Sequence, residues 1–297
     1  MTSNRFAMTE LPEKPLWLQR AAIVGVGLLG GSVGMSLRRS GVHVVGYART
    51  ESGCRSAVQQ GAVDEAFCDL ATACRQADVV VIASPVDRIA SLVDACAATM
   101  ADDAMITDVG STKAKIVAGV ADLGATVARR FVAAHPIAGS EKTGVANASR
   151  TLLDGKAVIL TPGHSPDPGF LQRAREFWRQ TGGEVIEMTP EEHDRRLAAV
   201  SHLPHLMASL LAGSTEPESL PLVGSGWKDM TRVASGDPAM WTAICDHNRD
   251  AILDQIDQFR GALDRLRALV AAEETGELRQ WLEAAKARKD QAVAARR

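Results

Sequence analysis

The stretch AAIVGVGLLGGS, residues 21–32, decides the fold that the sequence predicts. Its small and β-branched apolar residues are typical of a buried strand, and a helical pattern follows three glycines spaced as GxGxxG. In a dinucleotide-binding unit the first glycine permits a tight turn, the second lets the backbone approach a pyrophosphate, and the third lets the helix pack on the strand. A glycine-rich turn without a ligand is the alternative, but the surrounding strand and helix favour the dinucleotide site. The candidate cofactor residues of this loop are Gly25, Gly27, Leu28, Leu29 and Gly30.

Six further apolar runs alternate with helical patterns as far as Met188. Continuous apolar strands separated by helices are typical of a parallel sheet covered by helices on both faces. The expected strands are residues 42–47, 77–85, 104–110, 131–136, 157–162 and 182–188. The sequence therefore predicts an α/β Rossmann domain with a parallel sheet over residues 21–188, after a flexible lead over residues 1–20.

Beyond Met188 only helical patterns occur, so residues 189–297 are predicted to form an all-α domain for substrate binding and dimerisation. The expected helices are residues 191–211, an interrupted stretch over 224–236, a long helix over 238–270 and a tail over 277–297. A small helical domain often cannot bury its apolar faces alone, and obligate dimers bury such faces against a second copy. We therefore expect a homodimer formed through the helical domain. Packing of the helices on the sheet domain alone is the other arrangement.

The composition excludes several classes of function. With 33 Lys and Arg against 36 Asp and Glu, the net charge of −3 lacks the basic excess of a nucleic-acid-binding protein. The N-terminal residues have no apolar segment typical of a signal peptide, and the most apolar helical stretch, residues 197–213, is short for a membrane span. The five cysteines are scattered without a CxxC pair, which predicts neither a zinc site nor a disulfide framework. We expect a cytoplasmic protein that acts on a small molecule and contacts neither nucleic acid nor membranes.

The end of the second expected strand bears on the choice of cofactor. A site for NAD usually has an Asp or Glu about 20 residues beyond the glycines, which accepts a hydrogen bond from the ribose 2′-hydroxyl. The sequence has Ala48, Arg49 and Thr50 there instead, and an arginine favours a 2′-phosphate. NADP is therefore the predicted cofactor, with NAD bound without the acid as the alternative. Ser84 and Pro85, which end the third expected strand, complete the candidate cofactor residues.

Polar residues follow other strands at the same edge of the predicted sheet, where ligands bind in α/β proteins. The residues DVGSTK, 108–113, follow one strand, and His135 with Pro136 ends another. We therefore expect Ser111 and His135 to lie together beside the nicotinamide. A histidine there can accept the hydrogen of a substrate hydroxyl as hydride leaves. A core histidine bonded to a backbone carbonyl is the alternative.

The helical region contains a second group of candidates. Ser201, His202 and His205 lie close together in sequence, and the two histidines are three residues apart on nearly one helix face. The residues EEHD, 191–194, fit an exposed first helical turn, and no HExxH motif or Cys/His cluster predicts a metal site. Arg232, in a glycine-rich interruption, has the planar fork that suits a carboxylate. An ordinary surface arginine is the alternative.

Five motifs in this order resemble the prephenate/arogenate dehydrogenase family of tyrosine biosynthesis. They are GVGLLGGS at residues 25–32, TDVGSTKAK at 107–115, HPIAGSEKTGV at 135–145, SHLPH at 201–205 and GWKDMTRVASGDPAMW at 226–241. The resemblance extends from about residue 21 to residue 270. It implies a Rossmann domain and a helical domain that forms an intertwined dimer. It also implies an oxidative decarboxylation in which hydride leaves C4 of a cyclohexadiene for the nicotinamide and CO₂ leaves C1.

The resemblance also implies a role for each candidate site residue. His135 would hydrogen-bond the 4-hydroxyl of the substrate, and Ser111 would orient both that histidine and the hydroxyl. Arg232 would bind a substrate carboxylate. Trp241 would contact the substrate near its side chain, and Glu141 would lie at the pocket entrance. The residues that would line the rest of the pocket are Ser201, His202 and His205.

The resemblance leaves the substrate open between prephenate, which has a pyruvyl side chain, and arogenate, which has an alanyl one. His205 and the pair Glu141 and Lys142 resemble the prephenate-using members, so prephenate is the predicted substrate, with use of both as the alternative. A β-hydroxyacid dehydrogenase or pyrroline-carboxylate reductase would share the domain plan, but the HPIAGSE loop has no evident role there. An NADP-sensing regulator without catalysis is a further alternative, although a sensor needs none of the catalytic candidates.

Overall fold

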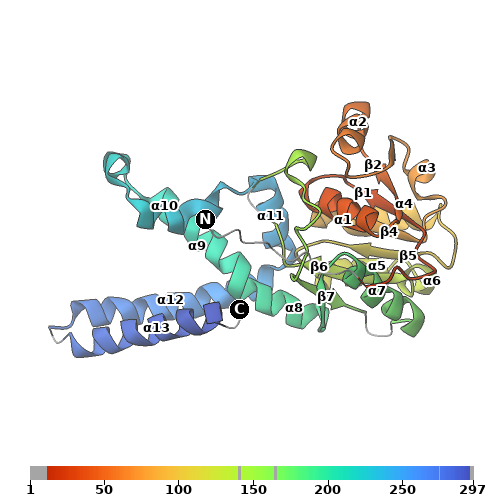
Figure 1. Cartoon of the computed structure of the whole chain (residues 1–297). Coiled ribbons are helices and arrows are strands. Elements are labelled where there is room, and N and C mark those ends of the chain that lie inside the picture. The colour runs from red at the N-terminus through yellow and green to blue at the C-terminus, as the bar shows by residue number, and fades with distance from the viewer. Residues whose placement is uncertain (1–11, 140–141, 164–165, 274, 295–297) are drawn as a thin grey trace. The chain divides into compact units, whose positions relative to one another are not determined.

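The structure is a computed structural model that describes residues 12–139, 142–163, 166–273 and 275–294 (Figure 1). The chain forms two compact units, of which the first ends at Arg249 and the second comprises Asp250–Arg297. The first unit contains an eight-stranded sheet. Its strands are β1 (Arg20–Val24), β2 (His43–Tyr47), β3 (Glu65–Phe67), β4 (Val79–Ile82), β5 (Met105–Asp108), β6 (Phe131–Pro136), β7 (Ala157–Thr161) and β8 (Glu184–Glu187).

The strand order is β3-β2-β1-β4-β5-β6-β7-β8, so the direction of winding changes between β1 and β4, as in a Rossmann fold. The predicted α/β Rossmann architecture is therefore confirmed. The expectation of an entirely parallel sheet is wrong at one pair, because β6 and β7 run antiparallel with His135 opposite Ile159. The described chain between these strands has no α-helix to carry a parallel crossover, only the 3₁₀ turn Val145–Asn147. The short strand β3 was not expected from the sequence.

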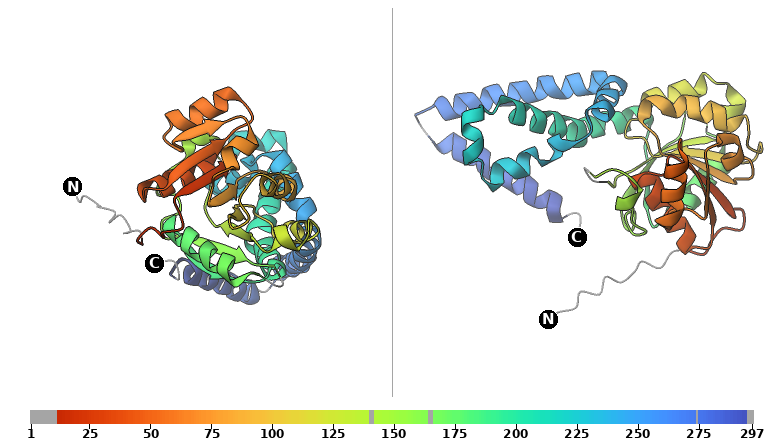
Figure 2. Two further views of the ribbon diagram at one scale, coloured as in Figure 1. Left: turned by 90° about the vertical axis from the view of Figure 1, so that its right-hand side faces the viewer. Right: turned by 90° about the horizontal axis from the view of Figure 1, so that it is seen from above.

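Helices cover both faces of the sheet (Figure 2). The side chains of β4 alternate between two apolar cores, with Val79 and Val81 in one and Val80 and Ile82 in the other. Helices α1 and α7 contribute to the first core, and α4 and α5 to the second. The helices of this part are α1 (Leu28–Arg39), α2 (Glu51–Gln59), α3 (Leu70–Cys74), α4 (Ile89–Ala97), α5 (Ala114–Ala121), α6 (Ala125–Ala128) and α7 (Pro168–Gln180).

After β8 the described chain is helical. The remaining helices of the first unit are α8 (Pro190–Leu197), a π-helix (Ala198–His202), α9 (Leu203–Ser214), α10 (Ser225–Thr231) and α11 (Pro238–His247). The second unit contains α12 (Arg249–Ala271), which begins at the boundary between the units, and α13 (Gly276–Ala294). None of the helices in the described ranges is long and apolar enough to cross a membrane. The domain boundary near residue 188 stays a prediction.

Two helices that were expected to be continuous are interrupted. The expected helix 191–211 contains the π-helix, and the expected helix 238–270 breaks at Asn248, whose backbone leaves helical geometry with φ −123° and ψ 36°. The buried Asn248 amide donates to the Asp194 carbonyl at 2.8 Å and to Nδ1 of His202 at 3.1 Å. The break therefore places a polar side chain where two buried acceptors need a donor.

A buried ion pair joins the carboxyl ends of β5 and β6. Nζ of Lys113 lies 2.5 Å from Oδ2 of Asp108, and neither side chain is exposed. The same ammonium donates to the Ala134 carbonyl at 2.8 Å, and the Asp108 carboxylate accepts from the Ala134 N–H at 3.0 Å. Both backbone groups of the residue before His135 are thus held by this ion pair.

Replacing Lys113 by Met should destabilise the fold, because it leaves the Asp108 carboxylate buried without its cation. Breaking a buried pair on one side costs about 3–5 kcal/mol of unfolding free energy. Urea denaturation followed by circular dichroism measures this loss. Lys115→Met is the matched control, because Lys115 is more than half exposed and pairs with Asp246 at the surface. Equal urea midpoints for the two variants would contradict the assigned importance of the buried pair.

Candidate active site

The glycine loop after β1 has the backbone that a dinucleotide requires. Gly25 has φ +99°, and a Cβ there would collide with the Ala83 carbonyl at the end of β4. At Gly27 an added Cβ would meet no other atom within 4 Å, so the backbone can be approached closely. Gly27 is also the N-cap of α1 and provides no side-chain cap, and no acidic residue lies in the first turn. The N–H groups of that turn therefore suit a pyrophosphate, and the loop fits a dinucleotide cofactor.

The other candidate cofactor residues lie at the ends of β2 and β4. Arg49 is exposed and forms no side-chain ion pair within the described part of the chain. Thr50 is the N-cap of α2, and its hydroxyl accepts from the Gly53 N–H at 3.1 Å. Ser84 is half-buried and lies beside the end of β1, with its Oγ 3.5 Å from the Val24 carbonyl. Pro85 is exposed and precedes the 3₁₀ turn Val86–Arg88.

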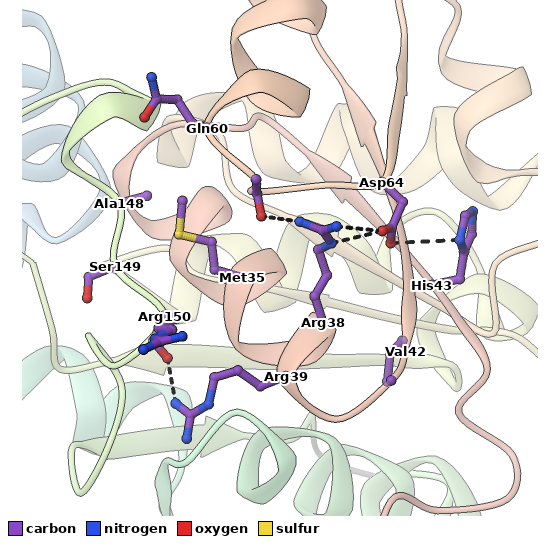
Figure 3. A pocket seen from close by; sticks show the side chains of 12 residues that line it. Met35, Arg38, Arg39, Val42, His43, Gln60, Asp64, Ala148, Ser149 and Arg150 are labelled. Carbon is purple, nitrogen blue, oxygen red and sulfur yellow. Dashed lines mark hydrogen bonds and ion pairs between the residues drawn. The ribbon is translucent and has the colours of Figure 1, made fainter. Parts of the chain in front are cut away.

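A cavity of about 680 Å³ lies elsewhere, beside the last turn of α1 (Figure 3). Its arginines are engaged within the protein: Nε of Arg38 donates to Asp64 at 2.9 Å, and Nη1 of Arg39 donates to the Arg150 carbonyl at 2.7 Å. Met35, the first residue of α1 that lines the cavity, follows Leu28 by seven residues, or about 10 Å of helix beyond the glycine loop. The cavity is therefore separate from the candidate active site.

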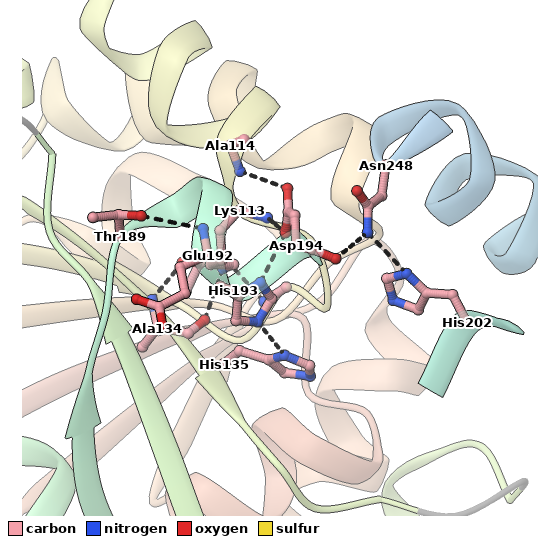
Figure 4. A network of polar contacts seen from close by, with 12 residues as sticks. Lys113, Ala114, Ala134, His135, Thr189, Glu192, His193, Asp194, His202 and Asn248 are labelled. Atoms are coloured by element: carbon pink, nitrogen blue, oxygen red, sulfur yellow. Dashed lines mark hydrogen bonds and ion pairs between the residues drawn. The ribbon is translucent and has the colours of Figure 1, made fainter. Parts of the chain in front are cut away.

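At the carboxyl edge of the sheet, His135 belongs to a hydrogen-bonded array with His193 and Asp194 (Figure 4). Nδ1 of His135 lies 2.8 Å from Nε2 of His193, and Nδ1 of His193 lies 2.7 Å from Oδ1 of Asp194. We call these three residues the His–His–Asp array. The expectation that residues 191–194 form an exposed turn is wrong for two of them, because His193 is 0% exposed and Asp194 is 4% exposed.

Asp194 is buried because it completes the N-terminus of α5. Its Oδ1 accepts from the Lys113 N–H at 2.8 Å, and its Oδ2 accepts from the Ala114 N–H at 2.9 Å. The first N–H groups of a helix have no partner within it, and Lys113, the N-cap of α5, provides no side-chain cap. The carboxylate from α8 supplies that cap and holds α8 against the edge of the sheet.

Burial favours the neutral forms of the histidines at this edge. It lowers the pKa of His135 well below its usual 6.5, and the charges of His193, Lys113 and His202 act in the same direction. It lowers the pKa of His193 too, although the hydrogen bond from that ring to Asp194 opposes the shift. The pKa of His202 falls to about 4, again chiefly through burial. These rings therefore act as hydrogen-bonding groups rather than as cations at neutral pH.

The candidate substrate residues of the helical region gather around Trp241. The ring of His205 stacks on that indole with centroids 3.5 Å apart and planes 8° apart, and the His202 ring meets its edge at 6.1 Å. His202 is also near the backbone of Ser111, which connects this group to the end of β5. The structure thus brings His202, His205 and Trp241 together.

The remaining candidate residues lie outside the His–His–Asp array and outside the group around Trp241. Ser201 is half-buried on the π-helix, and Arg232 is exposed at the start of the 3₁₀ turn Arg232–Ser235. Ser111 is half-buried, and no hydrogen bond joins its side chain to His135 in the described ranges, where His193 is the partner of that ring instead. Glu141 lies outside the described residues. Within those residues, no group of three or more His, Cys, Asp or Glu side chains could hold a metal ion.

His193 and Asp194 were not expected from the sequence, although a signal for them exists. They precede Leu197 and Ala198 by four residues each, so all four lie on one helix face, and all four are buried. The two acids that lead the segment favour an exposed face instead. The periodicity of the apolar residues was the more informative pattern.

Comparisons with known proteins identify the family of the chain. The family model "Prephenate dehydrogenase, nucleotide-binding domain" matches residues 33–187, and "Prephenate dehydrogenase, dimerization domain" matches residues 189–284. The prephenate dehydrogenase of Bacillus subtilis is 34% identical over 277 residues, which cover 90% of this chain and 74% of that protein. The cyclohexadienyl dehydrogenase of Zymomonas mobilis is 31% identical over 263 residues, covering 85% of this chain and 89% of that protein.

Solved structures give the same assignment. The prephenate dehydrogenase of A. aeolicus, in complex with hydroxyphenyl propionate and NAD+, has a TM-score of 0.86 and 36% identity, and the match covers 94% of this chain and 100% of that one. The arogenate dehydrogenase of Synechocystis has a TM-score of 0.78 and 29% identity, with 92% and 100% covered. These matches decide against the alternative of a β-hydroxyacid dehydrogenase. The chain belongs to the prephenate dehydrogenase family and is an oxidoreductase of the prephenate/arogenate dehydrogenase type.

Proposed function

We propose that the protein converts prephenate to 4-hydroxyphenylpyruvate, with oxidation of arogenate to tyrosine as a second activity. The observation that carries the proposal is the state of His135 at the carboxyl end of β6, the edge of the sheet at which the glycine loop follows β1. Its Nδ1 is held by His193, and its Nε2 has no hydrogen-bond partner within the described part of the chain. A neutral imidazole held in this way can accept a hydrogen bond from a substrate hydroxyl.

The proposed reaction requires little covalent chemistry from the protein. The nicotinamide, when bound, accepts the hydride from C4, while the C1 carboxylate leaves as CO₂ and the ring becomes aromatic. The hydroxyl hydrogen stays on the phenol in the balanced reaction, so His135 shares it during the reaction and returns it. Aromatisation supplies the drive, and the side chains orient the reacting atoms and stabilise the charge that develops on the hydroxyl.

The other residues are proposed to hold the substrate. Arg232 binds a carboxylate through its planar guanidinium, and Ser111 hydrogen-bonds the hydroxyl from the end of β5. The stacked rings of His205 and Trp241 offer a flat wall for the substrate, which Ser201 and His202 extend. The preference for prephenate rests on His205 and on Glu141 with Lys142, and Glu141 lies outside the described residues.

Replacing His135 by Asn should reduce kcat by about 10²–10⁴-fold, the usual contribution of a positioned acid–base group. The KM for the cofactor should change little, because His135 is not one of the proposed cofactor residues. The measurement is the initial rate of nicotinamide reduction at 340 nm with prephenate and with arogenate. The contrasting variant is Arg232→Ala, which should mainly raise the KM of the substrate by removing a contact made equally in the ground and transition states.

A wild-type protein without turnover on either substrate would contradict the proposed function. That result would favour the NADP-sensing regulator. An unchanged kcat in His135→Asn would remove this histidine from the reaction.

We also propose that NADP is the preferred cofactor, with NAD as the second. The support is Arg49, which stands at the end of β2 where an acid usually accepts from the ribose 2′-hydroxyl. Its exposed guanidinium suits a 2′-phosphate.

Arg49→Ala should raise the KM for NADP by about tenfold and leave that for NAD within about twofold, because only NADP has the phosphate that the guanidinium would bind. Arg55→Ala is the matched control, since Arg55 is an exposed arginine on the neighbouring α2 that pairs with Glu51. The measurement is the KM for NADP and for NAD, determined in parallel for the wild-type protein and both variants. If both KM values respond equally in Arg49→Ala, the assignment is wrong.

We further propose that the protein is a homodimer formed through its helical domain. Helix α12 carries a stripe of apolar side chains at alternating intervals of three and four residues, the period of a packed helix seam. Its members are Ile256, Phe259, Leu263, Leu266 and Val270. Three of them, Phe259, Leu263 and Val270, are 42%, 54% and 64% exposed in the single chain. Apolar exposure of this kind is typical of a surface covered by a partner.

Sedimentation of the wild-type protein should give about twice the 31.6 kDa mass of one chain. Phe259→Asp combined with Leu263→Asp should shift the mass toward the monomer, because two charges would enter the apolar stripe. Asp264→Asn, a polar change on the same helix, should leave the mass unchanged. A wild-type protein that sediments as a single chain would contradict the proposal.

A further inference from the structure

We propose that His193 and Asp194 are positioning residues for the reaction: they determine which nitrogen of His135 carries its proton and leave Nε2 bare toward the substrate. The inference rests on the proposed function, in which Nε2 of His135 accepts from the substrate hydroxyl. It assigns a role in that reaction to two residues that lie one turn into α8 and do not belong to the five sequence motifs.

The carboxylate of Asp194 fixes the first hydrogen position. Two backbone N–H groups, which can only donate, point at its two oxygens from 2.8 and 2.9 Å. Both oxygens therefore act as acceptors, as the two oxygens of an ionised carboxylate do. The third contact is Nδ1 of His193 at 2.7 Å from Oδ1. Since an ionised carboxylate has no hydrogen to give, this nitrogen of His193 is the donor.

The tautomer of His193 in turn fixes that of His135. A neutral imidazole has one donor and one acceptor nitrogen, so Nε2 of His193 is an acceptor. Nδ1 of His135, 2.8 Å away, must donate to it. The remaining nitrogen of His135, Nε2, then carries no hydrogen and presents its lone pair. One buried carboxylate thus sets the tautomer of a ring that it does not touch.

The surrounding charges keep both rings neutral and do not change which nitrogen of each ring is the donor. His135 faces His193, Lys113 and His202, all of which disfavour its cation, and burial lowers its pKa further. His193 faces Asp194, Asp108 and Lys113, and burial outweighs the two acids, so its pKa is also lowered. As hydride leaves C4, the hydroxyl becomes more acidic and transfers positive charge toward His135. That charge can be shared with His193 and stabilised by the Asp194 carboxylate.

A purely structural role would not require this arrangement. Asp194 already caps α5 through the two backbone contacts, and an apolar side chain at position 193 would fill buried space without the cost of desolvating an imidazole. The array instead orders the buried imidazole of His193 and the half-buried one of His135 so that a single acceptor nitrogen is left over, as a catalytic dyad supported by a carboxylate does.

The tautomer can be measured directly, without catalysis, by ¹⁵N NMR of the imidazole nitrogens in the histidine-labelled protein. The wild-type protein should show His135 protonated at Nδ1, with His135→Asn identifying its signals. In Asp194→Asn the amide group can donate to His193 instead of accepting. The order of donors should then reverse, and His135 should be protonated at Nε2. An Nε2–H tautomer in the wild-type protein would overturn the inference.

Kinetics test the consequence for the reaction. Asp194→Asn should reduce kcat by about 10²-fold or more, as expected when the wrong tautomer of a catalytic histidine is fixed, with the cofactor KM within about twofold. His193→Leu should also reduce kcat, because it removes the acceptor for Nδ1 of His135. His193→Gln should recover most of the rate, since its amide oxygen can replace that acceptor. Glu192→Gln, a charge change on the same turn of α8, is the control and should leave kcat unchanged.

The pH profile separates positioning from loosened packing. In the wild-type protein the acid limb of kcat/KM should lie below pH 6.5, because the pKa of His135 is lowered and only its neutral form accepts. Loss of the Asp194 charge disfavours the His135 cation further, so the limb should move to lower pH in Asp194→Asn. Admission of water through a loosened structure would instead raise that pKa and move the limb toward 6.5.

Unchanged kcat and pH profile in Asp194→Asn, or equal rates for His193→Gln and His193→Leu, would overturn the inference while leaving the proposed function standing. A wild-type protein that turns over neither substrate but shows the Nδ1–H tautomer would overturn the proposed function instead. Should Asp194→Asn fail to fold, the wild-type NMR spectrum and the rates of the two His193 variants still test the inference.

Discussion

The geometry of the candidate active site depends on one interaction, the acceptance of two backbone N–H groups at the start of α5 by the Asp194 carboxylate. Lys113 is the N-cap of that helix, but its side chain turns inward to Asp108 and cannot act as the cap. A carboxylate from another helix is therefore needed, and α8 supplies it. This contact fixes α8 at the carboxyl edge of the sheet, which brings His193 within hydrogen-bonding distance of His135.

Two helix N-termini at the same edge of the sheet differ in whether a side chain caps them. The first turn of α1 begins at glycines and receives no side-chain cap, which leaves its donors for the phosphates of a cofactor. The first turn of α5 is capped by the Asp194 carboxylate. The partial positive charge of that helix N-terminus therefore acts on a group of the protein itself. The difference separates the part of the edge that suits an anionic ligand from the part that orders the imidazole proposed to act in the reaction.

Much of the fold could be predicted because its signals are local. The GxGxxG loop lies between a strand and a helix in the sequence, and the apolar runs that follow are the buried strands of the sheet. The placement of His135 at a strand end followed from the same pattern. The antiparallel pairing of β7 accompanies the absence of a crossover helix from the described residues between β6 and β7. The break at Asn248 depends on two acceptors far away in sequence. Neither feature is visible in a short window of residues.

In the candidate site, too, the local signals could be read from the sequence and the long-range contacts could not. Residues in motifs could be named from the sequence, whereas His193 and Asp194 depend on contacts over 58 and 81 residues of chain. An acid next to a histidine in a first helical turn is most often solvated, and only the tertiary position of α8 changes that. The sequence therefore predicted the ring that is proposed to meet the substrate and not the two residues that hold it.

The π-helix between α8 and α9 has a consequence for how this family member can vary in length. Residues Ala198–His202 form a wider turn than an α-helix would, with the array on one side of it and His205 on the other. Each residue of an α-helix turns the chain by about 100°, so deleting one residue here would rotate α9 by that angle relative to α8. The ring of His205, on α9, would then turn away from Trp241, which lies on α11, and from His135. The number of residues in this turn is thus constrained as strongly as their chemical nature.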